Sequence, residues 1–414
     1  MEKKQEVEKT IQVSEAEKSR LKEHLLSGSP ILGEGSPFSE LLQKMVDGIM
    51  QGEMNDFLEE ERASGKLNKR NGSQKQRSVL TNSGPIKITK PRARYPGFES
   101  ELIPDRQRTL SSGMDEQILA LYGQGNSYED IRRLLQKMFG VSISTGKISA
   151  ITDSILPIIK EWRNRDLLPF YAVLYLDAQY FKVRHEGRYV QRASYTVYSV
   201  DIDGNRDILG LYIQDVEGAS RWATVLEDLK RRGVEDILVV CTDDLQGFSE
   251  VITDIFPTAV VQKCIVHMVR NSLRSVDDKD RKAMVKSLRS IYTSGDEQQA
   301  HIALETERAK WGAKYAYIFD RWEDKWGELL AFMDFPQGMH KMIYTTNPVE
   351  AVHRIIRKLI KGKAAWVSET ALLKQMYLSL MQNEKSWRRK ANGWKAVQRQ
   401  IVQLYPERTA KYLG

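Results

Sequence analysis

Three acidic residues stand where carboxylates could carry out phosphoryl chemistry. Asp177 follows an apolar run at 171–176, and Asp243 follows a second apolar run that begins at 237. We interpret both runs as buried strands that end at these aspartates, which could bring two rigid carboxylates close together. Crowded like charges are unfavourable unless a cation lies between them, so the pattern points to a divalent metal ion. The alternative is two unrelated strand-end caps.

The third acid, Glu350, lies in the first turn of a helix predicted over 347–362. The next charged residues along that helix are basic, beginning with Arg354, Arg357 and Lys358. A lone glutamate at the head of a basic helix could complete a metal site beside a nucleic-acid backbone. Glutamate is also favoured near helix N-termini for electrostatic reasons alone, so that alternative stays open.

The strands that must hold the aspartates belong to an α/β pattern. Three antiparallel strands are predicted at 171–176, 194–200 and 207–214, with an Asp-Gly turn at 203–204. Helix and strand then alternate, through a helix at 219–232, a strand at 237–240, a helix at 247–255 and a strand at 259–261. In such a domain the strand ends carry the chemistry.

Residues 272–342 show no strand pattern and read as an all-helical block, because their aromatic residues recur at helical spacing. Trp322 and Trp326 lie one helical turn apart, so one of them could stack on an unpaired base. The alternative is that these tryptophans form the core of the block.

The N-terminal part of the chain contains a helix and a basic stretch. Apolar residues at three- and four-residue spacing predict a helix over 37–61. Residues 66–94 contain nine basic residues and no acidic one, among many Gly, Ser, Asn and Pro. We interpret this stretch as an arm of loops and short strands beside DNA phosphates. The expected contacts are Lys87, Lys90, Arg92 and Arg94; a solvated linker is the alternative.

Residues 113–160 read as three short helices, in a region expected at 113–165. Ser127 and Asp130 have the spacing of a reciprocal cap at the start of the second helix. The third helix has a polar first turn that includes Thr145 and Lys147. This order predicts a helix-turn-helix in which Thr145 and Lys147 discriminate between DNA sequences. Three-helix packing without DNA is the alternative.

Composition excludes several classes of protein. The 414 residues include 63 Lys and Arg against 55 Asp and Glu, a net charge of +8 that mildly favours a polyanionic partner. Two cysteines, Cys241 and Cys264, exclude a disulfide framework and a four-cysteine zinc module, and they fit a reducing cytosol. No apolar run approaches the length of a membrane span, and the N-terminus lacks a secretory signal pattern. We expect a cytoplasmic protein that joins the nucleoid when it binds DNA.

Several motifs resemble those of one family. They are Leu176-Asp177-Ala178, Thr242-Asp243, Cys264-Ile265-Val266-His267 with Arg270-Asn271, and Thr345-Thr346-Asn347-Pro348-Val349-Glu350. In order and in strand context they resemble the bacterial Mutator-type insertion-sequence transposases, over essentially the whole chain. The resemblance implies an α/β, RNase H-like catalytic domain that is interrupted by an all-helical insertion and preceded by helical DNA-binding domains.

The resemblance also implies the site. Asp177, Asp243 and Glu350 become the catalytic and metal-binding triad of a DDE enzyme, with Mg²⁺ as cofactor, Mn²⁺ as a substitute and no zinc. The family usually has Gly after the second Asp, whereas this chain has Asp244; we prefer Asp243 because it directly follows the strand. The family signature near the catalytic core is Cys264, His267, Arg270 and Asn271.

We therefore expect a transposase that binds the terminal inverted repeats of its element and catalyses strand cleavage and transfer. Its partner would be double-stranded DNA, at element ends and at the target, and it would act as a homodimer. A catalytically inactive repressor derived from a transposase is the alternative, and an RNase H-like nuclease that only hydrolyses is a further one. The expected divisions are 1–65, 66–112, 113–165, a catalytic core at 166–271 and 343–414, and the insertion at 272–342.

Overall fold

The computed structural model describes residues 13–29, 31, 35–81, 84–105, 113–139, 142–345 and 347–412. The chain forms two compact units, Met1–Ser154 and Ile155–Gly414, and each has its own core. Among these described residues, no helix has both the length and the apolar character needed to cross a membrane.

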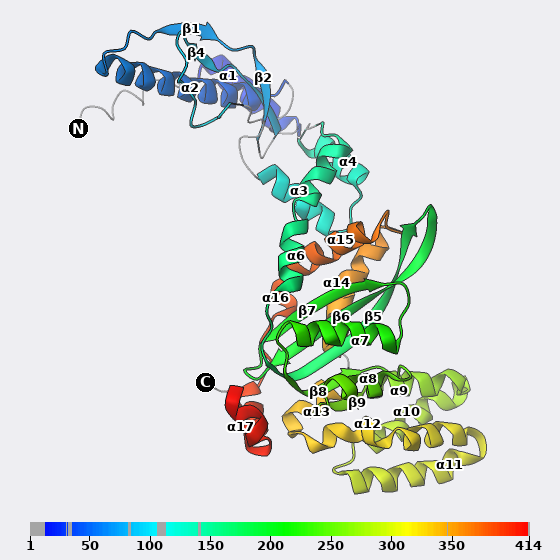
Figure 1. Cartoon of the computed structure of the whole chain (residues 1–414). Helices are drawn as coiled ribbons and strands as arrows, with labels where there is room; N and C mark the ends of the chain where they lie inside the picture. Colours follow the sequence, from blue (N-terminus) through cyan, green and yellow to red (C-terminus); the bar gives the residue numbers. More distant parts are fainter. Residues whose placement is uncertain are drawn as a thin grey trace. The chain divides into compact units, whose positions relative to one another are not determined.

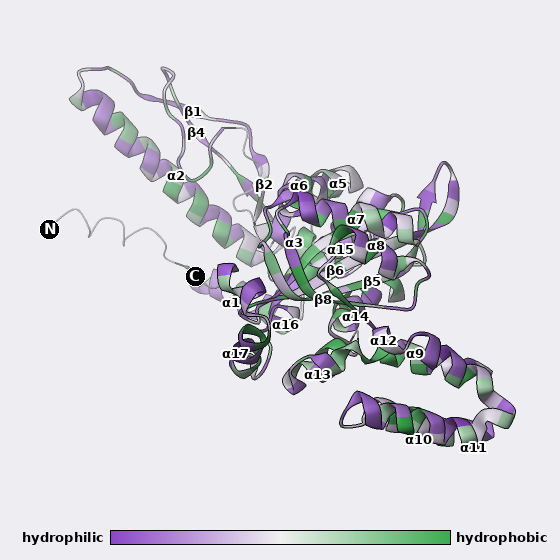
Figure 2. Ribbon diagram, turned by 60° about the horizontal axis from the view of Figure 1, so that its bottom comes forward, coloured by the Kyte–Doolittle hydropathy of each residue, from purple (hydrophilic) through white to green (hydrophobic). Residues whose placement is uncertain are grey.

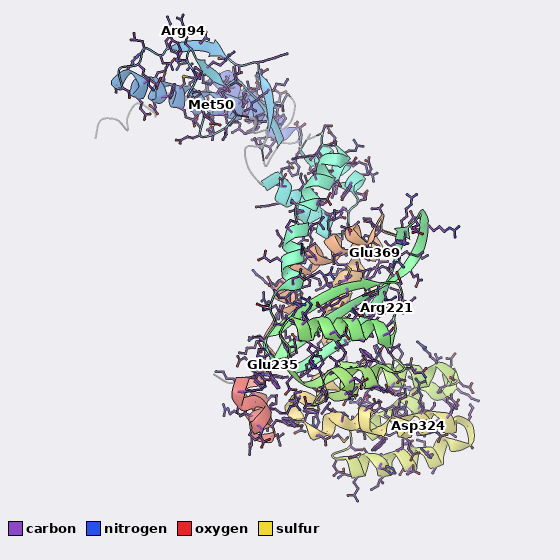
Figure 3. The ribbon with its side chains drawn as sticks, in the orientation of Figure 1. Met50, Arg94, Arg221, Glu235, Asp324 and Glu369 are labelled. Atoms are coloured by element: carbon purple, nitrogen blue, oxygen red, sulfur yellow. The ribbon has the colours of Figure 1, made fainter. Side chains whose placement is uncertain are left out.

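The first unit begins with helices α1 (Glu15–Leu26) and α2 (Pro37–Ala63). Ser36 caps α2 by accepting the Phe38 N–H at 3.2 Å, and Pro37 occupies the first turn, where no amide donor is lost. Figure 2 shows that α2 carries hydrophobic and hydrophilic residues along its whole length. Figure 3 marks Met50, which is fully buried at the middle of this helix.

Four short strands cover the apolar face of α2. They are β1 (Arg70–Ser73), β2 (Arg77–Thr81), β3 (Gly84–Ile88) and β4 (Pro91–Ala93). Strand β1 pairs with β4 and β2 pairs with β3, both antiparallel. Met50 packs in one cluster with Val79, Ile86 and Ile88. The basic stretch therefore forms short strands, as expected, and those strands build a core with α2.

Three helices end the first unit: α3 (Gly113–Gly123), α4 (Tyr128–Phe139) and α5 (Thr145–Asp153). The reciprocal cap at the start of α4 is present, because Asp130 N–H donates to Ser127 Oγ and Ser127 N–H donates to the Asp130 carboxylate, each at 3.1 Å. Ser144 caps α5 by accepting the Lys147 N–H at 3.2 Å. The predicted three short helices are thus confirmed.

The second unit is built on one five-stranded sheet. Its strands are β5 (Phe170–His185), β6 (Arg188–Asp201), β7 (Arg206–Gln214), β8 (Asp236–Thr242) and β9 (Val260–Lys263). The strand order is β7-β6-β5-β8-β9 (Figure 1). Strands β5, β6 and β7 pair antiparallel, while β8 lies parallel to β5 and β9 parallel to β8. This is the α/β arrangement that the sequence predicts.

Strand β5 does not end at Asp177, and here our expectation is wrong. Buried Phe181 and Val183 alternate with exposed Lys182 and Arg184, so the chain continues as a strand to His185. The turn at Glu186 and Gly187, both with positive φ, returns it into β6. Strand β8 pairs with β5 only as far as Tyr175, and β7 pairs with β6 only from Ala193, which lies opposite Tyr180. Beyond Tyr180, β5 and β6 therefore continue as a two-stranded ribbon (Figure 1).

Helices cover both faces of the sheet. On one face, α7 (Ala219–Arg231) and α8 (Phe248–Ile255) pack against Leu174 and Leu176. On the other, α14 (Asn347–Lys361) and α15 (Glu369–Gln382) share a core with Val173 and Tyr175. Because alternate strand residues face opposite sides, Asp177 belongs to the α14 side.

The remaining elements of the second unit are helical. They are α6 (Leu156–Asn164), α9 (Ile265–Ser272), α10 (Asp278–Tyr292), α11 (Glu297–Asp324), α12 (Trp326–Leu330), α13 (Gln337–Ile343), α16 (Glu384–Trp387), α17 (Trp394–Leu404) and α18 (Pro406–Thr409), with 3₁₀ turns at Leu273–Ser275, Ala331–Asp334 and Ala410–Tyr412. The described chain between β9 and α14 is helical or irregular, as the sequence predicts for this block.

Candidate active site

Asp177 on β5 and Asp243, directly after β8, lie at the same level of two neighbouring parallel strands. Tyr175 of β5 is in register with Cys241 of β8, and each aspartate stands two residues beyond its member of that pair. Side chains two residues apart on a strand share a face, so Asp177 belongs to the α14 side, where His353 contacts it. The Ala178 N–H donates to Asp177 Oδ1 at 2.8 Å and fixes that carboxylate.

The charge around Asp243 is unbalanced. Burial, then the charges of Glu217 and Asp177, raise the pKa of Asp243 to about 7. Among the described residues, no Lys or Arg forms an ion pair with Asp177, Asp243 or Glu217. These carboxylates are therefore crowded together without a cation from the protein.

Asp244 has the opposite environment. Its side chain is 5% exposed and pairs with Lys325, Arg321 and, at 3.4 Å, Lys263. Burial alone would raise the pKa of Asp244, but the hydrogen bonds from Lys325 and Arg321 outweigh it and hold the pKa below its usual value. Asp244 thus anchors the end of β8 to β9 and α11, which leaves Asp243 as the carboxylate beside Asp177.

Glu350 pairs with the sequence signature on α9. Its Oε1 atom lies 3.4 Å from His267 Nε2 and 3.9 Å from an Arg270 guanidinium nitrogen. The buried Cys264 begins α9, and its N–H donates to the Thr242 carbonyl at 2.8 Å, which holds this helix against the end of β8. The Cys-x-x-His motif therefore positions His267 beside Glu350. Thr346, in the motif that precedes Glu350, lies outside the described residues.

The sequence prediction missed His353. This residue follows Glu350 by one helical turn, is 1% exposed, and its Nδ1 atom lies 3.2 Å from Asp177 Oδ2. Its Nε2 atom has no hydrogen-bond partner among the described residues. His353 joins α14 to Asp177. The three-residue spacing from Glu350, which puts both side chains on one helix face, is the signal that could have found it.

Glu217 was missed as well. It lies in the loop between β7 and α7, where the Tyr180 hydroxyl donates to its Oε2 atom at 3.1 Å. Burial, opposed in part by this hydrogen bond and reinforced by the charge of Asp177, raises the pKa of Glu217. Nothing in the local sequence marks this glutamate, because only the folded sheet brings the loop to the aspartates.

The acids lie at one end of the sheet, but their side chains do not surround a common position that a metal ion could occupy. Within the described ranges, no three His, Cys, Asp or Glu side chains are placed so that they could hold a metal ion together. Asp177, Asp243 and Glu217 influence one another electrostatically, while Glu350 contacts His267.

The predicted DNA contacts fall into two groups. Most are exposed: Lys87, Arg92, Arg94, Thr145, Lys147, Arg354, Arg357 and Lys358. Figure 3 marks Arg94, which follows β4. Lys90 differs, because its side chain is 2% exposed, pairs with Asp105 and lies over the Phe98 ring. A buried and paired ammonium group is not available to a phosphate, so this expectation is corrected.

The two tryptophans lie inside or against the core. Trp322 is fully buried, and its indole N–H donates to Ser272 Oγ at 3.1 Å. A base cannot reach it, so our stacking interpretation of Trp322 is corrected. Trp326 is partly buried and donates to Glu297 at 2.9 Å. The core alternative therefore describes Trp322.

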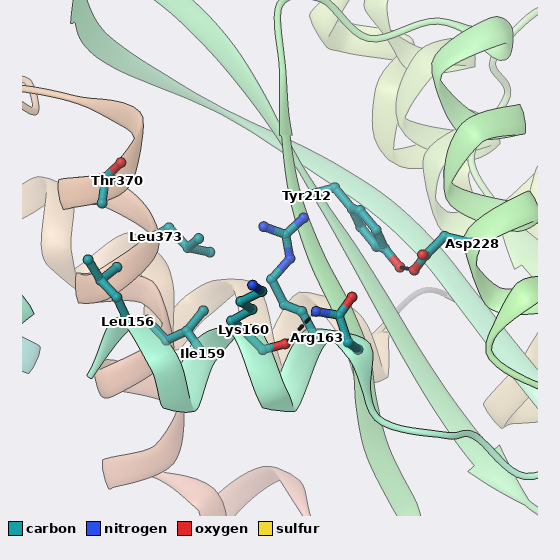
Figure 4. A pocket seen from close by; sticks show the side chains of 9 residues that line it. Leu156, Ile159, Lys160, Arg163, Tyr212, Asp228, Thr370 and Leu373 are labelled. Atoms are coloured by element: carbon teal, nitrogen blue, oxygen red, sulfur yellow. Dashed lines mark hydrogen bonds between the residues drawn. The ribbon is translucent and has the colours of Figure 1, made fainter. Parts of the chain in front are cut away.

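A separate cavity lies between α6 and the sheet. It has a volume of about 420 Å³ and is lined in part by Lys160, Arg163 and Tyr212 (Figure 4). Tyr212 donates to Asp228 at 2.7 Å, so the acid of this cavity already has a partner. None of the acids near Asp177 lines the cavity, which is distinct from the candidate site.

Comparison with known proteins places this α/β chain in a family. The family model described as "Transposase, Mutator family" matches residues 14–390, so the chain belongs to the Mutator family of transposases. Among its relatives is the transposase for insertion sequence element ISRM3 of Rhizobium meliloti, 36% identical over 94% of this chain and 98% of that protein. The resemblance seen in the sequence is confirmed.

One more relative and one solved structure were also compared with this chain. A probable insertion-sequence transposase of Corynebacterium diphtheriae is 36% identical over 78% of this chain and 100% of that protein. The strand transfer complex of the Drosophila P element transposase aligns over 73% of this chain and 87% of that chain, at 10% identity and a TM-score of 0.30, which is too low to add to the assignment.

Proposed function

We propose that this transposase is a DDE enzyme that cuts DNA at the ends of its insertion sequence and joins the freed 3′-OH ends to target DNA. Asp177, Asp243 and Glu350 are its proposed catalytic acids. The observation that carries the proposal is the equal level of Asp177 and Asp243 on neighbouring parallel strands, with Asp177 in contact with α14, the helix that also supplies Glu350. Membership of the Mutator family supports the reaction class.

We interpret the sheet as RNase H-like. Three antiparallel strands are followed by two parallel strands, in the order β7-β6-β5-β8-β9, and the helical block enters between β9 and α14. This order fits the interrupted catalytic domain that the sequence resemblance implies. It brings together two acids that lie 66 positions apart in the sequence, Asp177 and Asp243.

The acids are not placed around a common point in the described chain, but the chemistry of their oxygen donors suits a divalent cation. Asp177 and Asp243 offer hard carboxylate oxygens, and their charge is not neutralised by any Lys or Arg of the described chain. Mg²⁺ prefers such oxygen ligands, so Asp177 and Asp243 would hold it, with Glu350 joining from α14. The ion, when bound, would polarise the scissile phosphate and lower the pKa of an attacking water or 3′-OH.

The remaining residues of the site orient these acids. His353 holds one oxygen of Asp177, and the Ala178 amide holds the other. His267 and Arg270 hold Glu350 at the start of α14. A site whose ligands are fixed in advance avoids reorganisation during the reaction, which is a large part of catalytic power.

We also propose where DNA binds. Arg354, Arg357 and Lys358 are exposed on the helix that carries Glu350, and none forms an ion pair among the described residues. They would contact phosphates near the scissile bond. In the first unit, α4 and α5 form the proposed helix-turn-helix, with Thr145 and Lys147 exposed at the start of α5.

The active form is proposed to be a homodimer. Insertion needs two element ends at one target, whereas the chain carries a single set of the three acids, and a closed two-fold pair is the commonest solution. Light scattering of the protein, free and bound to end DNA, tests this. A monomer in both states with full transfer activity would contradict it.

Reconstitution tests the reaction. The full chain is mixed with DNA that carries the terminal inverted repeats and with a supercoiled target, in Mg²⁺, and the 3′-OH ends and joined products are resolved on gels. Asp243→Asn should abolish both products and leave end binding unchanged, whereas the matched variant Asp244→Asn should retain them. End binding without cleavage by the wild-type chain would favour the inactive repressor, and cleavage without joining would favour a nuclease.

A further inference from the structure

The two-stranded ribbon of residues 181–192, here called the β5–β6 ribbon, extends past the candidate site. Asp177 is level with the end of β8, and β5 continues from there to His185, eight residues further. At about 3.3 Å per residue, the tip of the ribbon lies up to about 26 Å beyond Asp177. Figure 1 shows the ribbon projecting from the sheet. A substrate bound at the carboxyl ends of β5 and β8 is therefore flanked by this ribbon.

A buried tryptophan braces one face of the ribbon. Trp366, in the loop between α14 and α15, is 1% exposed, and its ring packs edge-on against Phe181 with ring centroids 5.4 Å apart. The Trp366 N–H donates to the Lys182 carbonyl at 2.9 Å, and the Arg184 N–H donates to the Trp366 carbonyl at 2.8 Å. The ribbon is therefore held by the segment that follows the helix of Glu350.

The other face of the ribbon carries cations. Because side chains alternate along a strand, Lys182 and Arg184 point away from the face on which Phe181 contacts Trp366. Both are exposed, and so is Arg188, directly after the turn. Among the described residues, none of these three cations forms an ion pair. Their positive charge is therefore not balanced by acids of the protein.

An arginine at the base of the ribbon has the opposite environment. Arg192 is 8% exposed and pairs at 2.6 Å both with Asp215 and with Glu369, which Figure 3 marks on α15. The fold thus neutralises the cation that lies within the packed sheet and leaves the cations of the ribbon in solvent. Unpaired cations on a fixed support beside a substrate site attract a polyanion.

From this geometry we infer that the β5–β6 ribbon binds the phosphate backbone of duplex DNA beside the scissile bond, through Lys182, Arg184 and Arg188. The inference rests on the proposed function, which makes DNA the substrate at Asp177. Phosphate contacts fix the register of a protein on the duplex and need no base edges, and exposed cations on a braced ribbon suit that role. Phosphates of one strand are about 3.4 Å apart along the duplex axis, so a reach of about 26 Å limits these contacts to about eight base pairs from the cut.

Binding of the full chain to element-end DNA in EDTA tests the inference without catalysis. The duplex spans the terminal inverted repeat and the cleavage site. Fluorescence anisotropy at several salt concentrations gives the slope of log K against log salt, and hydroxyl-radical footprinting maps the protected positions. Changing Lys182, Arg184 and Arg188 together to Gln should reduce that slope by up to about 2.7, or 0.9 for each lost contact. Protection within about eight base pairs of the cut should be lost, and protection of the rest of the repeat should remain.

The matched control removes three exposed cations at the other end of the sheet. Lys390, Lys395 and Arg399 are exposed and form no ion pair within the described chain. Between them in the sequence, the Trp394 indole N–H donates to the Ile202 carbonyl at 2.8 Å, beside the turn from β6 to β7 and away from the ribbon. Changing all three cations to Gln removes the same charge and should leave the slope and the protection beside the cut unchanged.

The outcomes separate this inference from the proposed function. If the ribbon variant keeps the wild-type slope and protection while the wild type cuts and joins DNA in Mg²⁺, the inference fails and the proposed function stands. If protection beside the cut depends on the ribbon but the wild type does not cut in Mg²⁺, the binding surface stands and the DDE proposal fails. Equal changes in the ribbon variant and the control would show a general effect of charge, which overturns the inference. A wild type that does not bind the element ends would overturn both.

Discussion

The imidazole of His353 lies 3.2 Å from the carboxylate of Asp177, although the two residues are 176 positions apart in the sequence. The contact joins the helix that carries Glu350 to the strand that carries the first proposed catalytic acid. Because His353 is buried, water cannot replace this hydrogen bond. The helical block lies between these two elements in the sequence, so it must fold in a way that leaves the contact between His353 and Asp177 intact.

His353 should therefore act as a positioning residue. We expect His353→Ala to lower strand transfer by about 10- to 100-fold, because an acid that loses its orienting partner holds the cation less well. Raising Mg²⁺ should recover part of the activity, whereas a merely unfolded protein would not respond. His340→Ala is the control, since within the described chain the hydrogen bond of the His340 side chain goes to a backbone carbonyl, that of Phe335, and not to an acid. Loss that is equal in both variants and insensitive to Mg²⁺ would contradict this role.

Asp243 should reduce the stability of the cation-free protein at neutral pH. Its pKa is raised from 3.8 to about 7 on folding. Between those values the folded state binds the extra proton, so the free energy of unfolding falls as pH rises through this window, by at most about 4 kcal/mol. In EDTA at pH 8, Asp243→Asn should therefore be more stable than the wild type, and near pH 4 the difference should vanish.

Urea unfolding at pH 4, 5.5 and 8, with and without Mg²⁺, measures this effect. Mg²⁺ should stabilise the wild type at pH 8 and leave Asp243→Asn nearly unchanged. Asp236→Asn is the control, because its effect on the free energy of unfolding at pH 8 should have the opposite sign. Burial is outweighed at Asp236 by hydrogen bonds from Arg408 and Thr258, which lower the pKa. A wild type less sensitive to pH than Asp243→Asn would contradict the prediction.

Local patterns predicted much of this fold. The cap at Ser127 and Asp130, the Asp-Gly turn before β7 and the apolar runs of β5 and β8 all depend on neighbours in sequence. The extension of β5 could also have been predicted, because Glu186-Gly187 is a turn sequence between alternating residues. Composition suggested a DNA contact at Lys90, but only packing shows that its ammonium group is buried.

The residues of the candidate site also divide into those that the sequence could predict and those that it could not. Asp177 and Asp243 could be paired from sequence because each follows an apolar run, and parallel pairing of the two runs puts the aspartates at one level. His353 could have been suggested by its three-residue spacing from Glu350, but not its contact with Asp177, which forms only when α14 packs on the sheet. Glu217 could not be assigned from local sequence, because its loop reaches the aspartates only after the sheet has formed. A loop residue such as Glu217 leaves no periodic signal.

The exposed cations of the basic stretch should bind phosphates without regard to sequence. Changing Lys87, Arg92 and Arg94 to Gln should weaken binding to every duplex and reduce the slope of log K against log salt by up to about 2.7, or 0.9 for each lost phosphate contact. Mobility-shift titrations at several salt concentrations measure this slope. Lys90→Met, which removes a buried partner of Asp105, should lower the melting temperature and leave the slope unchanged. Thr145→Ala should instead reduce discrimination between element ends and other DNA.

Asp244 should matter for stability and not for chemistry. Removing its carboxylate leaves Lys263, Arg321 and Lys325 without their shared partner, although Lys263 keeps Glu328 at 2.5 Å. Unpairing buried charges lowers the free energy of unfolding by up to about 3–5 kcal/mol. Arg321 is 44% exposed and can turn to solvent. We therefore expect Asp244→Gly to lose less, about 1–3 kcal/mol of that free energy. Strand transfer at 25 °C and Mn²⁺ affinity should remain within about threefold of the wild type, since Asp243 keeps its place beside Asp177. Asp244→Gly with wild-type stability and no transfer would move the catalytic assignment from Asp243 to Asp244.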